Sequence, residues 1–206
     1  MSDARRWRAD QDRMSVILPG TWANIPLDDP EAGEALIARL VKKQVGRDDR
    51  LATTRRDAKV QLLKLARDAR EADAVQLAVS LELMPGLPFP ASIMSVYKPW
   101  SESARESGLT LPQRLDRMAP GGEVLELESG IAIRSVEVVD IRVGESTQPD
   151  IKLEYHVLVP DASQLLQVVV DVPIESEPEP VVALFDAIVD SIRWFDQPNG
   201  TSAEAS

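Results

Sequence analysis

A strict alternation of apolar and polar side chains over residues 151–159 is the feature that most restricts the fold. In the segment IKLEYHVLV, every odd-numbered position is apolar or aromatic, whereas the even-numbered positions include Lys152, Glu154 and His156. Successive side chains of a strand point to opposite faces, so this period predicts a half-buried strand with a polar second face.

Other segments show the same period. In IAIRSVEVVDIRV (131–143), Ile133 and Val139 share one face of an extended chain, and Arg134 and Asp140 share the other. Further strands are predicted within 16–25, 74–84 and 91–100 and in a hairpin that starts near 121, and LLQVVVDVP (165–173) is predicted to be a central strand. Because short turns join these strands, the pattern favours an antiparallel sheet.

Helices are predicted before and after this run of strands. In LDDPEAGEALIARLVKKQVG, Asp29 is a suitable N-cap, Pro30 fits the first helical position, and Gly46 can end the helix. A second, basic helix is predicted from about Leu51 to Ala72, a short one over 111–118, and a closing one over 181–195. This order predicts an α+β domain in which helices pack on an antiparallel sheet, an α/β/α sandwich.

The length of 206 residues and a hydrophobic content of 44% suit a single core. We expect one domain over 14–196, between a flexible arm (1–13) and a disordered tail (197–206). The only apolar run that follows the first arginines is 16–18, whereas a signal peptide needs roughly 7–15 apolar residues. No run approaches the ~20 residues that span a bilayer. We therefore expect a soluble, cytoplasmic protein without a membrane partner.

The charge of the chain is unevenly distributed. Residues 1–119 hold 19 Lys and Arg against 17 Asp and Glu, a balance of +2, and residues 120–206 hold 4 against 17, a balance of −13. An acidic chain is a poor phosphate binder, so no nucleic-acid partner is expected. The split favours another protein, or a second copy, bound partly through charge. Such binding should weaken as salt rises toward ~1 M.

Three features together resemble the PsbP-like α/β sandwich: the opening strand that ends in LPGTW, the meander of alternating strands, and the closing LFDAIVDSIRWF. The resemblance covers roughly residues 14–196 and is strongest to soluble actinobacterial proteins with this fold, relatives of the LpqN-type lipoproteins. It implies a non-enzymatic accessory or binding role. This chain contains no cysteine, so it lacks the lipidated cysteine of the LpqN-type proteins.

Motifs for catalysis are absent from the sequence. It has no cysteine, no Gly-x-Ser-x-Gly elbow, and neither of the common glycine-rich nucleotide loops. The only histidine, His156, has no second ligand at metal-binding spacing, so we interpret it as a surface or sheet-face residue. We therefore predict no catalytic residue, no cofactor and no metal. The acidic segment with Asp171, Glu175, Glu177 and Glu179 is either a solvated loop or a site for a hard cation.

A protein-interaction surface is the preferred hypothesis. Its predicted apolar residues cluster around two proline-rich turns, and its basic residues lie on the second helix: Met84, Leu87, Phe89, Tyr97, Trp100, Arg55, Arg56 and Lys59. Apolar groups on loops tend to mark recognition surfaces, but such a loop can also fold back over the core, and a basic helix face can simply be solvated. Trp22 and Trp194 are predicted to lie in the core.

The alternative hypothesis is a small-ligand-binding protein or an enzyme that works with carboxylates. It requires a pocket between the sheet and the helices. Glu126, Glu128 and Asp140 are available for that chemistry, but sequence alone does not bring them together.

Overall fold

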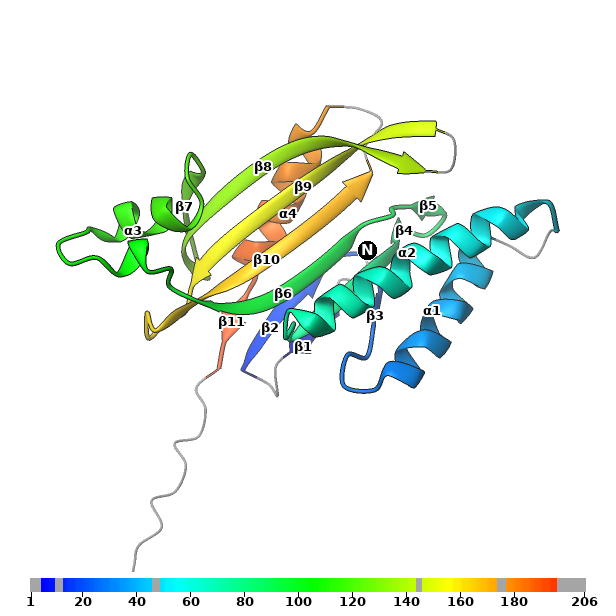
Figure 1. The fold of residues 1–206 in the computed structure, drawn as a ribbon, viewed down its shortest axis with the longest axis horizontal. Coiled ribbons are helices and arrows are strands. Elements are labelled where there is room, and N and C mark those ends of the chain that lie inside the picture. Colours follow the sequence, from blue (N-terminus) through cyan, green and yellow to red (C-terminus); the bar gives the residue numbers. More distant parts are fainter. Residues whose placement is uncertain (1–4, 10–12, 46–48, 144–145, 174–176, 196–206) are drawn as a thin grey trace, which may run out of the picture.

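A computed structural model describes residues 5–9, 13–45, 49–143, 146–173 and 177–195 of the chain. These residues form an eight-stranded sheet and a three-stranded sheet, with helices packed on both faces of the larger one (Figure 1). Every strand pairing in both sheets is antiparallel. The predicted α+β class is therefore confirmed.

The larger sheet has β10 in its interior, as predicted for that segment. Its strands, in spatial order, are β3 (Thr21–Asn24), β4 (Gln76–Met84), β6 (Ser92–Pro99), β10 (Gln164–Pro173), β9 (Ser146–Leu158), β8 (Gly130–Val143) and β7 (Glu123–Leu127). The two-residue strand β5 (Leu87–Pro88) pairs with β4. Every second residue of β10 from Leu166 to Val172 is a leucine or valine, and the side chains of these four residues are buried on one face of the strand.

One face of this sheet, the α4 face, carries the largest core cluster. Ile151, Leu153, Tyr155 and Val157 of β9 point to this face, and each is 0% exposed. Helix α4 (Glu179–Asp190) covers it and contributes Phe185, as Figure 1 shows. The odd-numbered side chains of residues 151–159 are thus buried, as the alternation predicts.

The smaller sheet completes the cover of the α4 face. It consists of β1 (Arg5–Ala9), β2 (Met14–Leu18) and β11 (Arg193–Trp194), with β2 in the middle. β2 buries Met14, Val16 and Leu18 in the same core cluster as Phe185. Residues 5–9, expected to belong to a flexible arm, form a strand because they pair in register with β2.

On the opposite face, the α1–α2 face, the described helices cover the two ends. Helices α1 (Pro30–Val45) and α2 (Ala52–Glu71), linked in part by the short 3-10 helix η1 (Asp49–Leu51), pack over β3, β4 and β6. Helix α3 (Leu111–Met118) and the 3-10 helix η2 (Ser103–Arg105) pack near β8 and β10. The predicted start of α1 is confirmed, since the Ala32 N–H donates to Asp29 Oδ1 at 3.0 Å.

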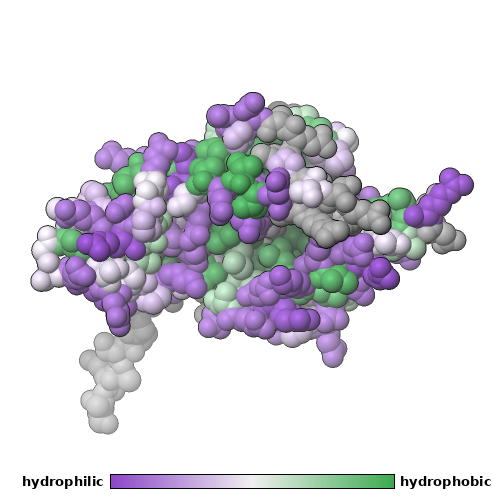
Figure 2. Space-filling view, turned by 45° about the horizontal axis from the view of Figure 1, so that its top comes forward, coloured by the Kyte–Doolittle hydropathy of each residue, from purple (hydrophilic) through white to green (hydrophobic). Residues whose placement is uncertain are grey.

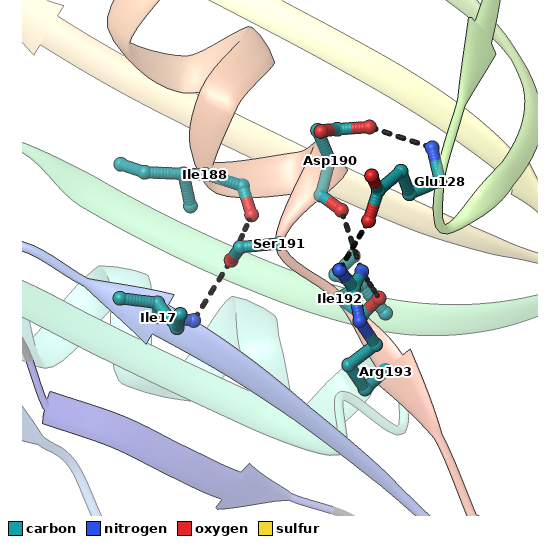
Figure 3. A network of polar contacts seen from close by, with 7 residues as sticks. All are labelled: Ile17, Glu128, Ile188, Asp190, Ser191, Ile192 and Arg193. Atoms are coloured by element: carbon teal, nitrogen blue, oxygen red, sulfur yellow. Dashed lines mark hydrogen bonds and ion pairs between the residues drawn. The ribbon is translucent and has the colours of Figure 1, made fainter.

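The closing helix is shorter than predicted. It ends at Asp190, and Arg193–Trp194 form β11 beside β2. Ser191 Oγ donates to the Ile188 carbonyl and accepts a hydrogen bond from the Ile17 N–H at 2.9 Å (Figure 3). These two bonds satisfy the Ile188 carbonyl at the end of α4 and hold the following residues on β2. A helix that continued past Asp190 would not make the bond to β2.

A second set of bonds connects the end of α4 and the residues after it to the β7–β8 turn. The Glu128 N–H donates to Asp190 Oδ1, and Arg193 donates both to the Asp190 carbonyl and to the Glu128 carboxylate, as Figure 3 shows. Trp194, predicted to lie in the core, is partly buried and donates from Nε1 to the Ser129 carbonyl at 2.7 Å.

Candidate functional site

The predicted apolar surface is divided among three places in the structure. Phe89 packs against the largest core cluster, with its ring 6.3 Å from that of Phe185. Trp100 is only 5% exposed in a separate cluster, where its Nε1 donates to the Ala162 carbonyl at 3.0 Å. Both aromatic rings therefore pack in the core. For these two residues the structure matches the alternative interpretation, in which the loop folds back over the core.

The remaining members of that set lie nearer to solvent. Leu87 and Met84, on the β4–β5 hairpin, are 48% and 52% exposed. Tyr97 is partly buried, and the Arg13 guanidinium lies 4.8 Å from its ring centroid. Of the five predicted apolar and aromatic surface residues, Met84 and Leu87 are thus the two that are about half exposed.

The three predicted basic residues, in contrast, lie together. Arg55, Arg56 and Lys59 line an open groove of about 430 Å³ between α1 and α2. The α1 side adds Lys42 and two apolar residues, Ala38 and Val41.

The electrostatics of this groove, which we call the α1–α2 groove, differ from those of the rest of the chain. Residues 30–45 and 49–71 carry ten Lys and Arg against six Asp and Glu, a balance of +4, which leaves −15 for the rest of the chain of net charge −11. Arg56 pairs with Asp57 at 3.5 Å, but both side chains are well exposed, so the pair is weak. The groove therefore combines cationic walls with an apolar floor.

A polar strip occupies the part of the α1–α2 face that lies on β9 and β10. Glu154 Oε1 accepts a hydrogen bond from Gln167 Nε2 at 2.6 Å and lies 3.3 Å from His156 Nε2. His156 is 4% exposed, and burial lowers the pKa of its imidazole, an effect that Glu154 opposes and Lys98 reinforces. At neutral pH the imidazole is therefore neutral, and the contact with Glu154 is not an ion pair. His156 is buried on the sheet face, so of the two predicted positions the sheet face agrees with the structure.

Two carboxyl groups lie close together farther along the strip. Asp150 is 3% exposed, and burial together with the nearby Asp171 raises its pKa to about 6, although Lys152 opposes the rise. Burial also raises the pKa of Asp171. Sequence reasoning considered Glu126, Glu128 and Asp140 and missed this pair, because its members come from β9 and β10, which only the sheet register brings together.

A buried ionic cluster on the α4 face also escaped prediction. Arg134 of β8 reaches Asp186 of α4 and Glu123 of β7, and Tyr155 Oη donates to Asp186 Oδ1 at 2.8 Å. Burial and the adjacent carboxylate raise the pKa of the Tyr155 phenol, which keeps it protonated as a donor. The available signal was Arg134 directly after the apolar residues 131–133. We interpret the cluster as a set of polar contacts that holds α4 on the sheet.

The cavities limit what the molecule can enclose. Between the sheet and α4, a cavity of about 10 Å³ is lined by Gln76, Ser95 and seven apolar side chains. That is room for about one water molecule, not for a substrate. Neither this cavity nor the α1–α2 groove is lined by a carboxylate. Neither hollow is therefore the pocket between sheet and helices that the alternative hypothesis requires.

Two further features of the described residues bear on partners. No group of three or more histidines and carboxylates among them is arranged to hold a metal ion. Glu175, part of the predicted acidic segment, lies outside the described residues. None of the helices in the described ranges is both long and apolar enough to cross a membrane.

The fold defines an α+β protein with an antiparallel sheet between helices. No protein-family model and no curated protein matches the chain. Among solved structures, it is similar to the Ran-binding protein Mog1p of Saccharomyces cerevisiae, with a TM-score of 0.47 and 8% identity over 94% of this chain and 96% of that one. A likeness of this size assigns neither a family nor a function.

Proposed function

We propose that the protein is a non-enzymatic interaction module that binds an acidic segment of a partner protein in the α1–α2 groove. The observation that carries the proposal is the convergence of Lys42, Arg55, Arg56 and Lys59 around one open hollow on an otherwise acidic molecule. The apolar floor of the groove suits a segment that mixes carboxylates with aliphatic residues. The resemblance of the sequence to the PsbP-like sandwich and its LpqN-type relatives also supports an accessory role, here in the cytoplasm.

Charge supports a protein partner over a nucleic acid. The excess of +4 on the two helices is local, and the −15 elsewhere would repel a long phosphate backbone that extended beyond the groove. A short acidic peptide fits within the positive region and avoids the rest of the surface. Leu87, on the exposed β4–β5 hairpin, is proposed as a secondary contact.

The test is fluorescence anisotropy with a labelled twelve-residue probe peptide that alternates glutamate pairs with leucines. We expect binding at 0.05 M NaCl that weakens on the order of tenfold at 0.5 M, because the charged groups are exposed. Arg56→Glu combined with Lys59→Glu should weaken binding by at least about tenfold.

The matched control makes the same charge change elsewhere on α2. Lys64 and Arg67 are exposed and do not line the groove, so Lys64→Glu combined with Arg67→Glu should have a much smaller effect. An equal loss in both double variants would indicate attraction by the whole helix and would contradict the groove. Binding of a single-stranded DNA probe, but not of the peptide, would contradict the partner class.

A further inference from the structure

Strand β8 is much longer than the strand that pairs with its outer side. β7 pairs with β8 only from Gly130 to Arg134, whereas the pairing of β8 with β9 continues to Val143. From Ser135 onward, the side of β8 that faces away from β9 has no strand partner among the described residues. We call Ser135–Asp140 the open β8 edge.

The backbone of this edge can form hydrogen bonds with another strand. In an antiparallel pair, alternate residues exchange hydrogen bonds with the neighbour, and the residues between them turn N–H and C=O to the other side. The register of β8 with β9 is unbroken from Ala132 to Val143, so no bulge bends the edge away. Every second residue of the open β8 edge therefore presents a donor and an acceptor outward.

The open β8 edge carries two acidic side chains but lacks the other usual protections of an edge strand. Natural edge strands are commonly blocked by lysine, proline or a bulge, and the open β8 edge contains none of these. Instead, Val136 and Val138 are 45% and 53% exposed on the α4 face. Figure 2, in which the top of Figure 1 comes forward, shows hydrophobic surface gathered at the upper middle of the molecule, where β8 crosses it.

Charge indicates which strand would fit. Glu137 and Asp140 are exposed on the edge, and Asp150 and Glu154 of β9 lie opposite Val139 and Ser135. Only one cation, Lys152, stands opposite this edge, across from Glu137. The open edge itself thus carries two exposed carboxylates and no cation. An added strand would meet Val136, Val138 and Asp140 on the α4 face, and Glu137 between Ser135 and Val139 on the other.

A second copy of the chain fits this edge poorly. In a two-fold antiparallel pairing, the register that brings Val136 of one copy beside Val138 of the other also places the two Glu137 side chains directly opposite each other. Like charges in directly opposed positions destabilise a strand pair. A foreign strand with cations at those positions avoids the conflict.

We propose that the open β8 edge binds an extended segment of a partner protein in which aliphatic and cationic residues alternate, by addition of a strand to the sheet. Main-chain hydrogen bonds supply the binding, and the alternation of side chains supplies the specificity. This surface is separate from the α1–α2 groove, which lies over the other half of the sheet and selects the opposite charge.

The test uses a labelled eight-residue peptide of alternating valine and lysine, measured by fluorescence anisotropy. Val138→Lys places a cation on the edge and should weaken binding at least tenfold. The matched control is Val124→Lys on β7, because Val124 is also an exposed valine (42%) but lies outside the open edge. It should change the dissociation constant less than twofold, and Arg56→Glu with Lys59→Glu should not weaken binding.

A peptide of the same sequence, N-methylated at alternate positions, separates strand addition from attraction by charge. We expect it to lose binding, because it cannot complete the ladder. Equal binding of the methylated peptide, or no binding of the parent peptide at millimolar concentration, would overturn the proposal. So would an equal loss in the Val138→Lys and Val124→Lys variants. A concentration-dependent dimer that Val138→Lys abolishes would overturn the foreign partner and identify a second copy instead.

Discussion

Asp150→Asn should make the protein more stable at neutral pH. Asp150 is almost fully buried, and its pKa rises from 3.8 to about 6 because burial and Asp171 disfavour the ionised form. Each pKa unit corresponds to about 1.4 kcal/mol, so an ionised Asp150 costs up to about 3 kcal/mol of unfolding free energy at pH 7. An amide of the same shape avoids that cost, and we expect a gain of about 1–3 kcal/mol.

The sign of the pH dependence provides a stricter test. The folded-state pKa is raised, so the stabilising contribution of Asp150 is complete below pH ~4 and is lost as pH rises through about 6. Over that window the native protein should lose up to about 1.4 kcal/mol per pH unit relative to Asp150→Asn. Urea denaturation of both proteins between pH 4 and 7.5 measures the difference directly. A constant difference across the window, or a variant less stable at pH 7, would refute the reasoning.

Three further substitutions test a close backbone approach and a partly buried hydrogen bond. Gly20 has φ +81°, and a Cβ there would lie 2.1 Å from the Glu82 carbonyl oxygen, so Gly20→Ala should cost at least about 3 kcal/mol. Gly86 has the same φ with open space around it, so Gly86→Ala should cost only about 1–2 kcal/mol; equal losses in thermal unfolding would disprove the close approach. Tyr155→Phe removes the donor to Asp186 and should cost about 1–2 kcal/mol in urea denaturation, whereas an unchanged midpoint would show that this bond adds no net stability.

Local sequence patterns predict the fold well where the structure depends on local rules. The alternation over residues 151–159 assigns each side chain to its face, because the two-residue period of a strand needs no information from elsewhere. The N-terminus of α1 is similarly local, since Asp29 caps a helix that starts at the next residue. The end of α4 is not local: Ser191 bonds to Ile17, 174 residues away in the sequence.

The residues of the candidate site also divide into those that a local pattern predicts and those that depend on distant parts of the sequence. Arg56 and Lys59 belong to one helix, so their spacing predicts a shared basic face, and the structure adds α1 as the second wall. Phe89 and Trp100 lie near turns, but their burial depends on Phe185 of α4 and Ala162 of the β9–β10 turn, distant residues whose positions no local pattern indicates.

The open β8 edge shows why the proposed interaction surface is hidden from sequence analysis even though the strand over 131–143 is predicted. Its segment resembles other half-buried strands, and the alternation places Val136 and Val138 on the same face as Arg134 and Asp140. They are exposed because β7 pairs only as far as Arg134, and because β8 has β9 on one side alone. The relevant property is a mismatch in length between two neighbouring strands. Since an unpaired edge invites association, a long edge without bulge, proline or lysine is better explained by binding than by stability alone.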